Sequence, residues 1–285
     1  HARAIYRKTT NWQGLLRIKT SAFKGFAAAL ALTTLPIAGA QAQDSASPQA
    51  QAGFCNADRA AYRGKVFIPY IKAGATLDGV TEAGLKRLAA EATERTSIDR
   101  AARDETIHVR GIDIENEDIC HFKFLYWPIT QDSAPLSPEA QLKVEDYLAR
   151  GKFIVFDVRD AGVMDWREAV QNVLGRVNLG EMEPMGEGHL LRHVFYRNSA
   201  LPGSQNMSAV QVQVPLQNRG DPSAQVVVGE RNWASAWAGL TLVPKSAAYE
   251  QSIRGGINLL IYALTGNYKG DQSDEILQKI ERSGP

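Results

Sequence analysis

Two aspartates and an arginine follow directly after an apolar run, where a sheet strand would give way to a loop. Asp157, Arg159 and Asp160 come after Phe153–Phe156. Continuous apolar runs are typical of strands buried in parallel sheets, and open α/β sheets bind ligands beyond the carboxyl ends of their strands. Two neighbouring carboxylates can act as acid and base in hydrolysis, or can hold a divalent cation. The alternative is structural: Arg159 pairs with one aspartate, and the other caps the following helix.

Further polar and aromatic residues lie at the ends of two other predicted strands, Phe122–Trp127 and Gln225–Gly229. If these strands are parallel, their following loops meet at one edge of the sheet. We therefore expect one ligand site formed by Tyr126, Trp127, Asp157, Arg159, Asp160, Arg231, Asn232 and Trp233. Within it, Asp157 should be the more buried acid, held ionised by Arg159 or Arg231, and Asp160 should be free to meet a ligand.

The tryptophans allow two interpretations. Trp233 and Trp237 are four residues apart and would share one face of a helix. An exposed pair would form a platform for a sugar, whereas burial in the core is the commoner fate of such residues. The same alternatives apply to Tyr126 and Trp127.

No pattern in the chain predicts a metal or a cofactor. His189 and His193 have the spacing of two metal ligands on a helix, but the glutamate of the metalloprotease motif does not follow the first histidine. The acidic run Asp113–Asp118 lacks the glycine and the spacing of a calcium loop. Ordinary surface or hydrogen-bonded side chains explain both, and we predict no metal and no cofactor.

Residues 1–42 have the features of a secretory signal peptide. Basic residues precede the apolar run Phe26–Ala38, and Ala40-Gln41-Ala42 offers the small residues that signal peptidase recognises. The run is shorter than the roughly 20 residues of a membrane span. The first methionine is Met164, so we also expect the upstream part of this segment to be untranslated. We predict export to the periplasm, with no membrane span after cleavage.

Removal of residues 1–42 would leave an acidic chain. The segment holds six of the 32 basic residues and none of the 31 acidic ones. An acidic balance disfavours nucleic acid and anionic membrane as partners, because both require basic surfaces. In an oxidising compartment Cys55 and Cys120 can form a disulfide, which we expect; the alternative is two separate buried thiols.

The rest of the chain alternates between strand-like and helix-like segments. Residues 43–56 lack periodicity, which predicts a disordered linker. We expect a folded domain over residues 57–272 and a C-terminal tail over residues 273–285. Strands are predicted at Lys65–Ile71, with Pro69 placing its end at an edge or bulge, and at 106–109, 122–127, 153–156, 210–214 and 225–229. Helices are predicted at 81–96, after the N-cap pair Ser137-Pro138, at 165–174 and at 249–264. We expect residues Val177–Gln205 to form an irregular insertion that holds part of the functional site. Alternation with short connections predicts an α/β fold with a mostly parallel sheet and helices on both faces.

Four segments of the chain carry a resemblance to a known family. They read "FKFLYWPIT", "LSPEAQLKVEDYLARGKFIVFDVRDAG", "GERNWASAWAG" and "INLLIYALTGNYKGDQ". Over roughly residues 64–272 the chain resembles the domain of unknown function at the C-terminal end of BatA-like (aerotolerance-type) bacterial membrane proteins. The resemblance implies a flavodoxin-like sheet related to class I glutamine amidotransferases and ThuA-like proteins, without an established activity.

Amidotransferases of that class use a cysteine nucleophile on a sharp turn after a buried strand. The matching position after Phe156 reads Asp157 to Gly162, without cysteine or serine. We therefore expect a non-enzymatic binding or assembly module that works with cell-envelope proteins or a small-molecule ligand. The alternative is a hydrolase or lyase that acts on a carbohydrate-like substrate through the paired aspartates.

Overall fold

The computed structural model describes residues 59–98, 106–159, 162, 165–198, 200–206, 208–215 and 224–265. In chain order its elements are α1 (Arg59–Tyr62), β1 (Val66–Ile71), α2 (Ala75–Arg95), β2 (Ile107–Ile112), β3 (Phe124–Ile129), α3 (Pro138–Ala149), β4 (Phe153–Val158), α4 (Trp166–Leu174), β5 (Met182–Pro184), the 3₁₀ helix η2 (Leu190–Arg192), β6 (Gln211–Gln213), β7 (Val226–Gly229), α5 (Trp233–Trp237) and α6 (Ala247–Leu264).

These strands form one sheet in the order β2-β1-β3-β4-β7-β6-β5. The pairings among β2, β1, β3, β4 and β7 are parallel, whereas β6 runs antiparallel to both β7 and β5. The predicted α/β architecture is confirmed. The sheet is mixed because the short strands β5 and β6 extend it beyond β7.

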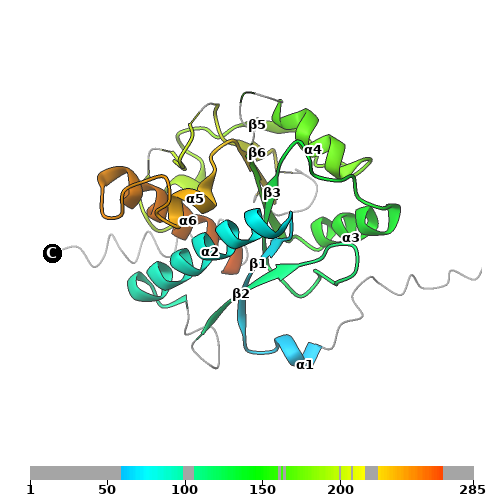
Figure 1. Ribbon diagram of the computed structural model, residues 1–285, viewed down its shortest axis with the longest axis horizontal. Coiled ribbons are helices and arrows are strands. Elements are labelled where there is room, and N and C mark those ends of the chain that lie inside the picture. The colour runs from blue at the N-terminus through cyan, green and yellow to red at the C-terminus, as the bar shows by residue number, and fades with distance from the viewer. Residues whose placement is uncertain are drawn as a thin grey trace, which may run out of the picture. The chain divides into compact units, whose positions relative to one another are not determined.

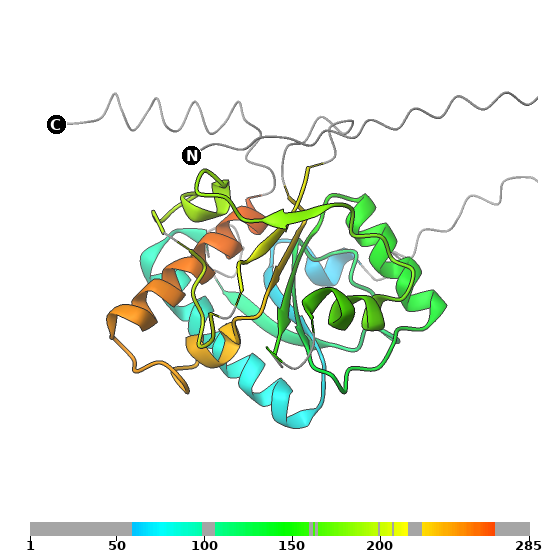
Figure 2. The same ribbon diagram turned by 90° about the horizontal axis from the view of Figure 1, so that it is seen from above.

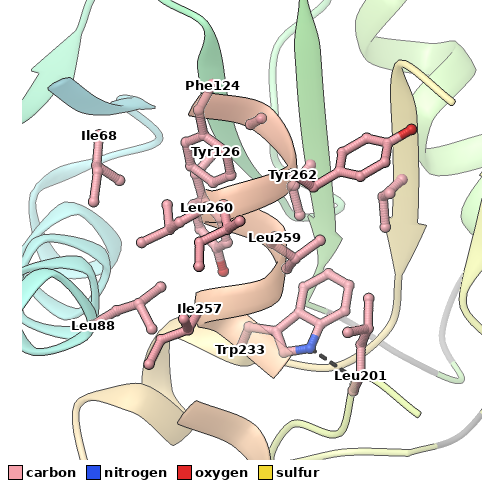
Figure 3. Close-up of a cluster of buried hydrophobic side chains, with 14 of the residues drawn as sticks. Ile68, Leu88, Phe124, Tyr126, Leu201, Trp233, Ile257, Leu259, Leu260 and Tyr262 are labelled. Carbon is pink, nitrogen blue, oxygen red and sulfur yellow. Dashed lines mark hydrogen bonds between the residues drawn. The ribbon is translucent and has the colours of Figure 1, made fainter. Parts of the chain in front are cut away.

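Helices cover both faces of this sheet (Figures 1 and 2). On one face α2, α5 and α6 enclose an apolar cluster that includes Ile68, Phe124 and Ile257; Figure 3 shows part of it. On the other face, the side chains of α3 and α4 pack on Leu125, Phe156 and their neighbours. Of the helices in the described residues, none is long and apolar enough to cross a membrane.

Local signals explain where the helices on the second face begin and end. Ser137 Oγ accepts a hydrogen bond from Ala140 N at 3.1 Å, and Pro138 is the first residue of α3. Gly151, at φ 72°, turns the chain from α3 into β4, a conformation that glycine adopts readily. The predicted helix start and the glycine stop are both confirmed.

Two sequence-based predictions need correction. Pro69 predicted that its strand ends at a sheet edge or a bulge, but this strand, β1, lies between β2 and β3. Its bridge to β3 is confined to Tyr70 with Tyr126, so a proline nearby removes little of that ladder. The insertion Val177–Gln205 is not irregular throughout, because it contains β5 and η2. Its last residues do reach the carboxyl end of β7, since Gln205 N donates to Arg231 O at 3.0 Å.

The helices α2, α5 and α6 approach one another closely at glycines. A Cβ on Gly84 of α2 would lie 2.2 Å from the carbonyl oxygen of Ala234 in α5. A Cβ on Gly256 of α6 would lie 2.6 Å from a methyl of Leu88 and 2.9 Å from the Trp237 ring. Gly256 thus packs against side chains of α2 and α5.

An ion-pair network joins α2 to α6. Glu91 pairs with Arg87 and Arg95 at 2.6 Å each, and Glu250 pairs with Arg95 at 2.7 Å and Arg254 at 2.8 Å. The hydrogen bond from Arg95 is the largest of the effects that lower the pKa of Glu250 below its ordinary value of 4.5. A lowered carboxyl pKa stabilises the fold above the unfolded pKa, and this stabilisation is lost as pH falls through the folded pKa.

Replacing Glu250 by glutamine should therefore lower the unfolding free energy at pH 7 by roughly 1 kcal/mol, since the pair is partly exposed. The difference from wild type should shrink as pH falls from 4.5 through the lower pKa of the folded protein, because the wild-type carboxyl becomes neutral over that range. Urea unfolding at pH 7 and at pH values below 4.5 measures it. Glu94→Gln, an exposed residue of α2, is the control and should change stability little at either pH. A Glu250→Gln deficit that grows in acid would contradict the assignment.

Candidate functional site

The carboxyl ends of β3, β4 and β7 lie side by side, and we refer to them as the carboxyl edge. Asp157 of β4 pairs with Pro128 of β3 on one side and with Gly229 of β7 on the other. The residues that follow β4 and β7 therefore leave the sheet together. The structure brings Asp157 and Arg159 together with Arg231 and Asn232 at this edge, although more than 70 residues of sequence separate the first pair from the second.

Asp157 is fully buried, and both of its carboxylate oxygens are occupied. Oδ2 accepts hydrogen bonds from the hydroxyl of Tyr126 and from Trp233 N, the latter at 2.8 Å. Oδ1 accepts from Asn232 N at 2.8 Å and from Arg231 N at 3.4 Å. The carboxylate thus binds backbone N–H groups at the start of α5, which have no acceptor within the helix. Asp157 holds the turn between β7 and α5 in place.

The electrostatics of Asp157 reflect its burial. Desolvation raises the pKa of its carboxyl, while the charge of Arg159 and the bond from Tyr126 act in the opposite direction. Desolvation likewise raises the pKa of the Tyr126 hydroxyl, which also accepts a hydrogen bond from Ala234 N at 3.2 Å. Asp157 is the buried acid that the sequence predicted. The charge of Arg159 favours the ionised carboxyl, in the predicted direction, while backbone N–H groups and a tyrosine supply the hydrogen bonds to it.

Arg159 lies half-buried directly after β4. Its backbone N donates to Ile129 O at 2.8 Å, and its Nη2 donates to Ser235 Oγ at 3.0 Å. Its Nη1 is buried and has no hydrogen-bond partner among the residues that the structure describes. A guanidinium presents its donors in a fixed plane, so Nη1 offers an N–H group in a defined direction at the carboxyl edge.

The side chain of Arg231, unlike that of Arg159, connects two loops of the chain. Its side chain is buried, and it donates from Nη1 to Asn206 Oδ1 at 3.1 Å and from Nη2 to Ser208 O. Desolvation lowers the pKa of this guanidinium. Ser204 Oγ adds a bond to Asn232 O at 3.2 Å. Ser204, Asn206 and Ser208 are thereby attached to the turn that follows β7.

Asn232 occupies the left-handed region at φ 51° and ψ 49°. Asparagine tolerates this conformation better than most residues with a side chain, which allows the sharp turn from β7 into α5. Its backbone N donates to Asp157, while its side-chain Oδ1 has no hydrogen-bond partner among the described residues. The turn after β7 thus holds a buried acceptor without a donor.

Buried polar atoms without a partner are concentrated here. Native proteins leave few such atoms, and each calls for an explanation such as a bound water or ion. Half of the eight found in the described residues lie on the loops of the carboxyl edge: Arg159 Nη1, Gln205 Oε1, Arg231 Nε and Asn232 Oδ1. The sequence did not indicate Gln205 or Ser235. Ser235 is a single serine within the apolar run Trp233–Trp237, and nothing local predicts the role of Gln205.

The tryptophan rings are packed in the core, although the backbone N of Trp233 binds Asp157. Trp127 follows Tyr126 in β3, so its side chain points to the opposite face of the sheet, where its ring lies 5.4 Å from that of Phe156. Trp233 is 1% exposed, stacks on Trp237 at 6.5 Å and donates from Nε1 to Leu201 O at 3.0 Å (Figure 3). The predicted placement of Trp127 and Trp233 in a ligand site is wrong. Core packing, the alternative interpretation, describes both.

Several predicted features lie outside the described residues. They include Asp160, the signal peptide at 1–42, the linker at 43–56 and the tail at 273–285. Cys120 is buried in the turn before β3, but Cys55 is outside the described range, so the disulfide stays a prediction.

His189 and His193 flank η2 instead of sharing an α-helix. His189 Nδ1 accepts from Leu191 N at 3.3 Å, and His193 Nε2 lies 3.1 Å from Gly188 O. Burial lowers the pKa of His189 to about 4, which keeps it neutral at pH 7. Over the described ranges, no group of three or more His, Cys, Asp and Glu side chains is placed to hold a metal ion.

A comparison with models of protein families gives a match. The model of a domain of unknown function, DUF4159, matches residues 67–264. This range begins in β1 and ends with α6, so it includes every strand of the sheet and both loops of the carboxyl edge. No curated protein matches the chain. Since the match covers more than half of the sequence, the chain belongs to the DUF4159 family.

Proposed function

We propose that this chain is an exported binding or assembly module of the cell envelope, and that it binds its ligand or partner at the carboxyl edge through Arg159. The signal-peptide features of residues 1–42 support export to the periplasm. The resemblance to domains attached to BatA-like membrane proteins supports a role together with envelope proteins.

The proposed fold class is flavodoxin-like, related to class I glutamine amidotransferases. The five parallel strands support it, because their order β2-β1-β3-β4-β7 corresponds to the order 2-1-3-4-5 of flavodoxin-like sheets. Sheets of this kind bind ligands beyond the carboxyl ends of their strands. Arg159 and the turn after β7 are at that position.

One observation carries the proposal: polar atoms at the carboxyl edge are buried and unpaired. Within the described ranges, Arg159 Nη1 is a charged donor without an acceptor, and Asn232 Oδ1 and Gln205 Oε1 are acceptors without donors. An unpaired buried polar atom costs about 1–3 kcal/mol. A ligand that paired these atoms would recover that free energy, which is a physical reason for binding at this place.

Binding is favoured over acid–base chemistry by the state of Asp157. Its two oxygens already accept four hydrogen bonds from the chain, so the carboxylate has no free position toward a substrate. The hydrolase or lyase alternative also relied on exposed tryptophans, and Trp233 and Trp237 are buried. No observation on the described residues favours that alternative.

A thermal-shift panel tests the proposal. The panel contains glycans, divalent metal salts and short acidic peptides, each assayed with wild type, Arg159→Lys and Arg176→Lys. A ligand at 100 times its Kd stabilises by about 2.7 kcal/mol, which raises the Tm of a domain of this size by roughly 5–10 °C. We expect at least one compound to do so for wild type. Arg159→Lys should lose the shift, because lysine does not reproduce a planar guanidinium.

Arg176 is the matched control, because it is exposed after α4 on the other face of the sheet. Arg176→Lys should respond to the panel as wild type does. A shift that persists in Arg159→Lys, or that both arginine variants lose equally, would contradict binding at the carboxyl edge.

A further inference from the structure

A cavity of about 550 Å³ lies at the opposite, amino end of the sheet. Val66, the first residue of β1, and Phe122, just before β3, line it. The residues after the carboxyl ends of α2 and α6, Thr96 and Thr265, form another part of the wall. Its volume is within the range of small-molecule sites, about 300–1,000 Å³. The site proposed at the carboxyl edge does not use this cavity.

Aromatic side chains form part of the cavity wall. The Tyr62 ring stacks on His121 at 4.8 Å and lies 5.4 Å from both Phe67 and Phe122. Phe195 also lines the cavity and is 47% exposed, which is unusual for a large apolar side chain in this protein. Side chains of α6 complete the apolar surface. Such a wall suits an apolar chain or ring, because burying apolar surface is favourable by roughly 25 cal/mol per Å².

The charges around the cavity are of one sign. Lys65 and Lys123 line it and are exposed, and no aspartate or glutamate is among the described residues of the wall. The carboxyl ends of α2 and α6 oppose this charge, each with about half an elementary negative charge. Lys123 Nζ already binds Leu264 O at 2.8 Å at the end of α6. Two full positive charges therefore exceed the helix contribution, and the opening stays positive.

We propose that this cavity binds an anionic amphiphile of the fatty-acid type. Its hydrocarbon chain lies against Phe67, Phe122 and Phe195, and its carboxylate lies beside Lys65 and Lys123. An apolar wall accounts for the affinity, and the two lysines account for the choice of an acid over a neutral or basic head group.

Calorimetric titration with three probes of equal chain length tests this proposal. Laurate, dodecanol and dodecylamine are added below their micelle concentrations to the full chain. We expect laurate to bind at one site per chain, and dodecanol and dodecylamine to bind at least tenfold more weakly. Absence of laurate binding, or equal affinity for dodecylamine, would overturn the proposal.

Variants locate the site. Lys65→Gln should weaken laurate about threefold and Lys65→Gln/Lys123→Gln about tenfold, in line with about 1 kcal/mol or less for each exposed charge pair. Phe195→Ser should weaken all three probes alike, because it removes apolar wall without removing charge. Arg176→Gln, outside the cavity, should bind laurate as wild type does. Laurate affinity unchanged in both the lysine double variant and Phe195→Ser, with the Tm of each near wild type, would overturn the assignment to this cavity.

Discussion

The Asp157→Ala variant is expected to lose on the order of 4 kcal/mol of unfolding free energy. The substitution removes the acceptor of three backbone N–H groups and of the Tyr126 hydroxyl, all at a fully buried position. Each buried donor left unpaired costs about 1–3 kcal/mol, part of which relaxation and entering water recover. Domains are stable by only about 5–15 kcal/mol, so much of the variant should be unfolded or aggregated. Urea unfolding followed by tryptophan fluorescence measures the loss.

Two further variants test whether the loss of stability comes from the hydrogen bonds of Asp157 or from the removal of an acidic residue in general. Asp157→Asn keeps one oxygen for Asn232 N but turns an NH₂ group toward Trp233 N and Tyr126, so it should cost roughly half as much. Asp132→Ala removes an exposed aspartate and should leave stability within about 0.5 kcal/mol of wild type. A stably folded Asp157→Ala protein would show that the carboxylate is not needed for the turn, and would reopen a chemical role for it.

Two glycines of the same helix should respond in opposite directions to alanine. Gly84→Ala would place a Cβ 2.2 Å from Ala234 O, a backbone atom that cannot swing away. Helices α2 and α5 would have to separate, and overpacking of this kind typically costs about 1–3 kcal/mol. A Cβ on Gly79, by contrast, would have no atom within 4 Å of it. Gly79→Ala should therefore stabilise by about 0.5–1 kcal/mol, the ordinary advantage of alanine in a helix.

Chemical denaturation of both alanine variants measures this difference, which should reach roughly 3 kcal/mol. Gly79→Ala serves as the internal control, because it shares the helix and the substitution. Equal effects of the two variants would show that α2 and α5 are not in direct backbone contact at Gly84. In that case the position of α5, and with it the carboxyl edge, would need revision.

Much of the fold was predictable because apolar runs and helix caps are local. Buried strands such as β4 contain continuous apolar runs, here Phe153–Phe156, and Ser137-Pro138 and Gly151 mark the limits of α3 directly. The three-residue strands β5 and β6 were not predictable as an antiparallel extension. Segments so short carry little periodicity, and their pairing depends on contacts that are distant in sequence.

The sequence predicted that the candidate site lies at the carboxyl edge, but it did not predict which side chains contact one another there. Parallel strands bring Asp157, Arg159 and Arg231 together, and this follows from topology alone. In a strand buried on both faces no alternation of apolar and polar residues shows which face each side chain occupies. The sequence thus could not separate Tyr126, which reaches Asp157, from Trp127, which does not. The partners of Asp157 are mostly backbone N–H groups, and residue types do not reveal them.

The central claim is that the carboxyl edge binds a ligand through Arg159, and a crystal structure tests it most directly. The full chain would be crystallised with the panel compound that raises its Tm most. The predicted result is electron density for that compound within hydrogen-bond distance of Arg159 Nη1, with Asp157 still bound to Tyr126 and the start of α5. The contradicting result is a compound located elsewhere, with Arg159 Nη1 bound only to atoms of the chain itself.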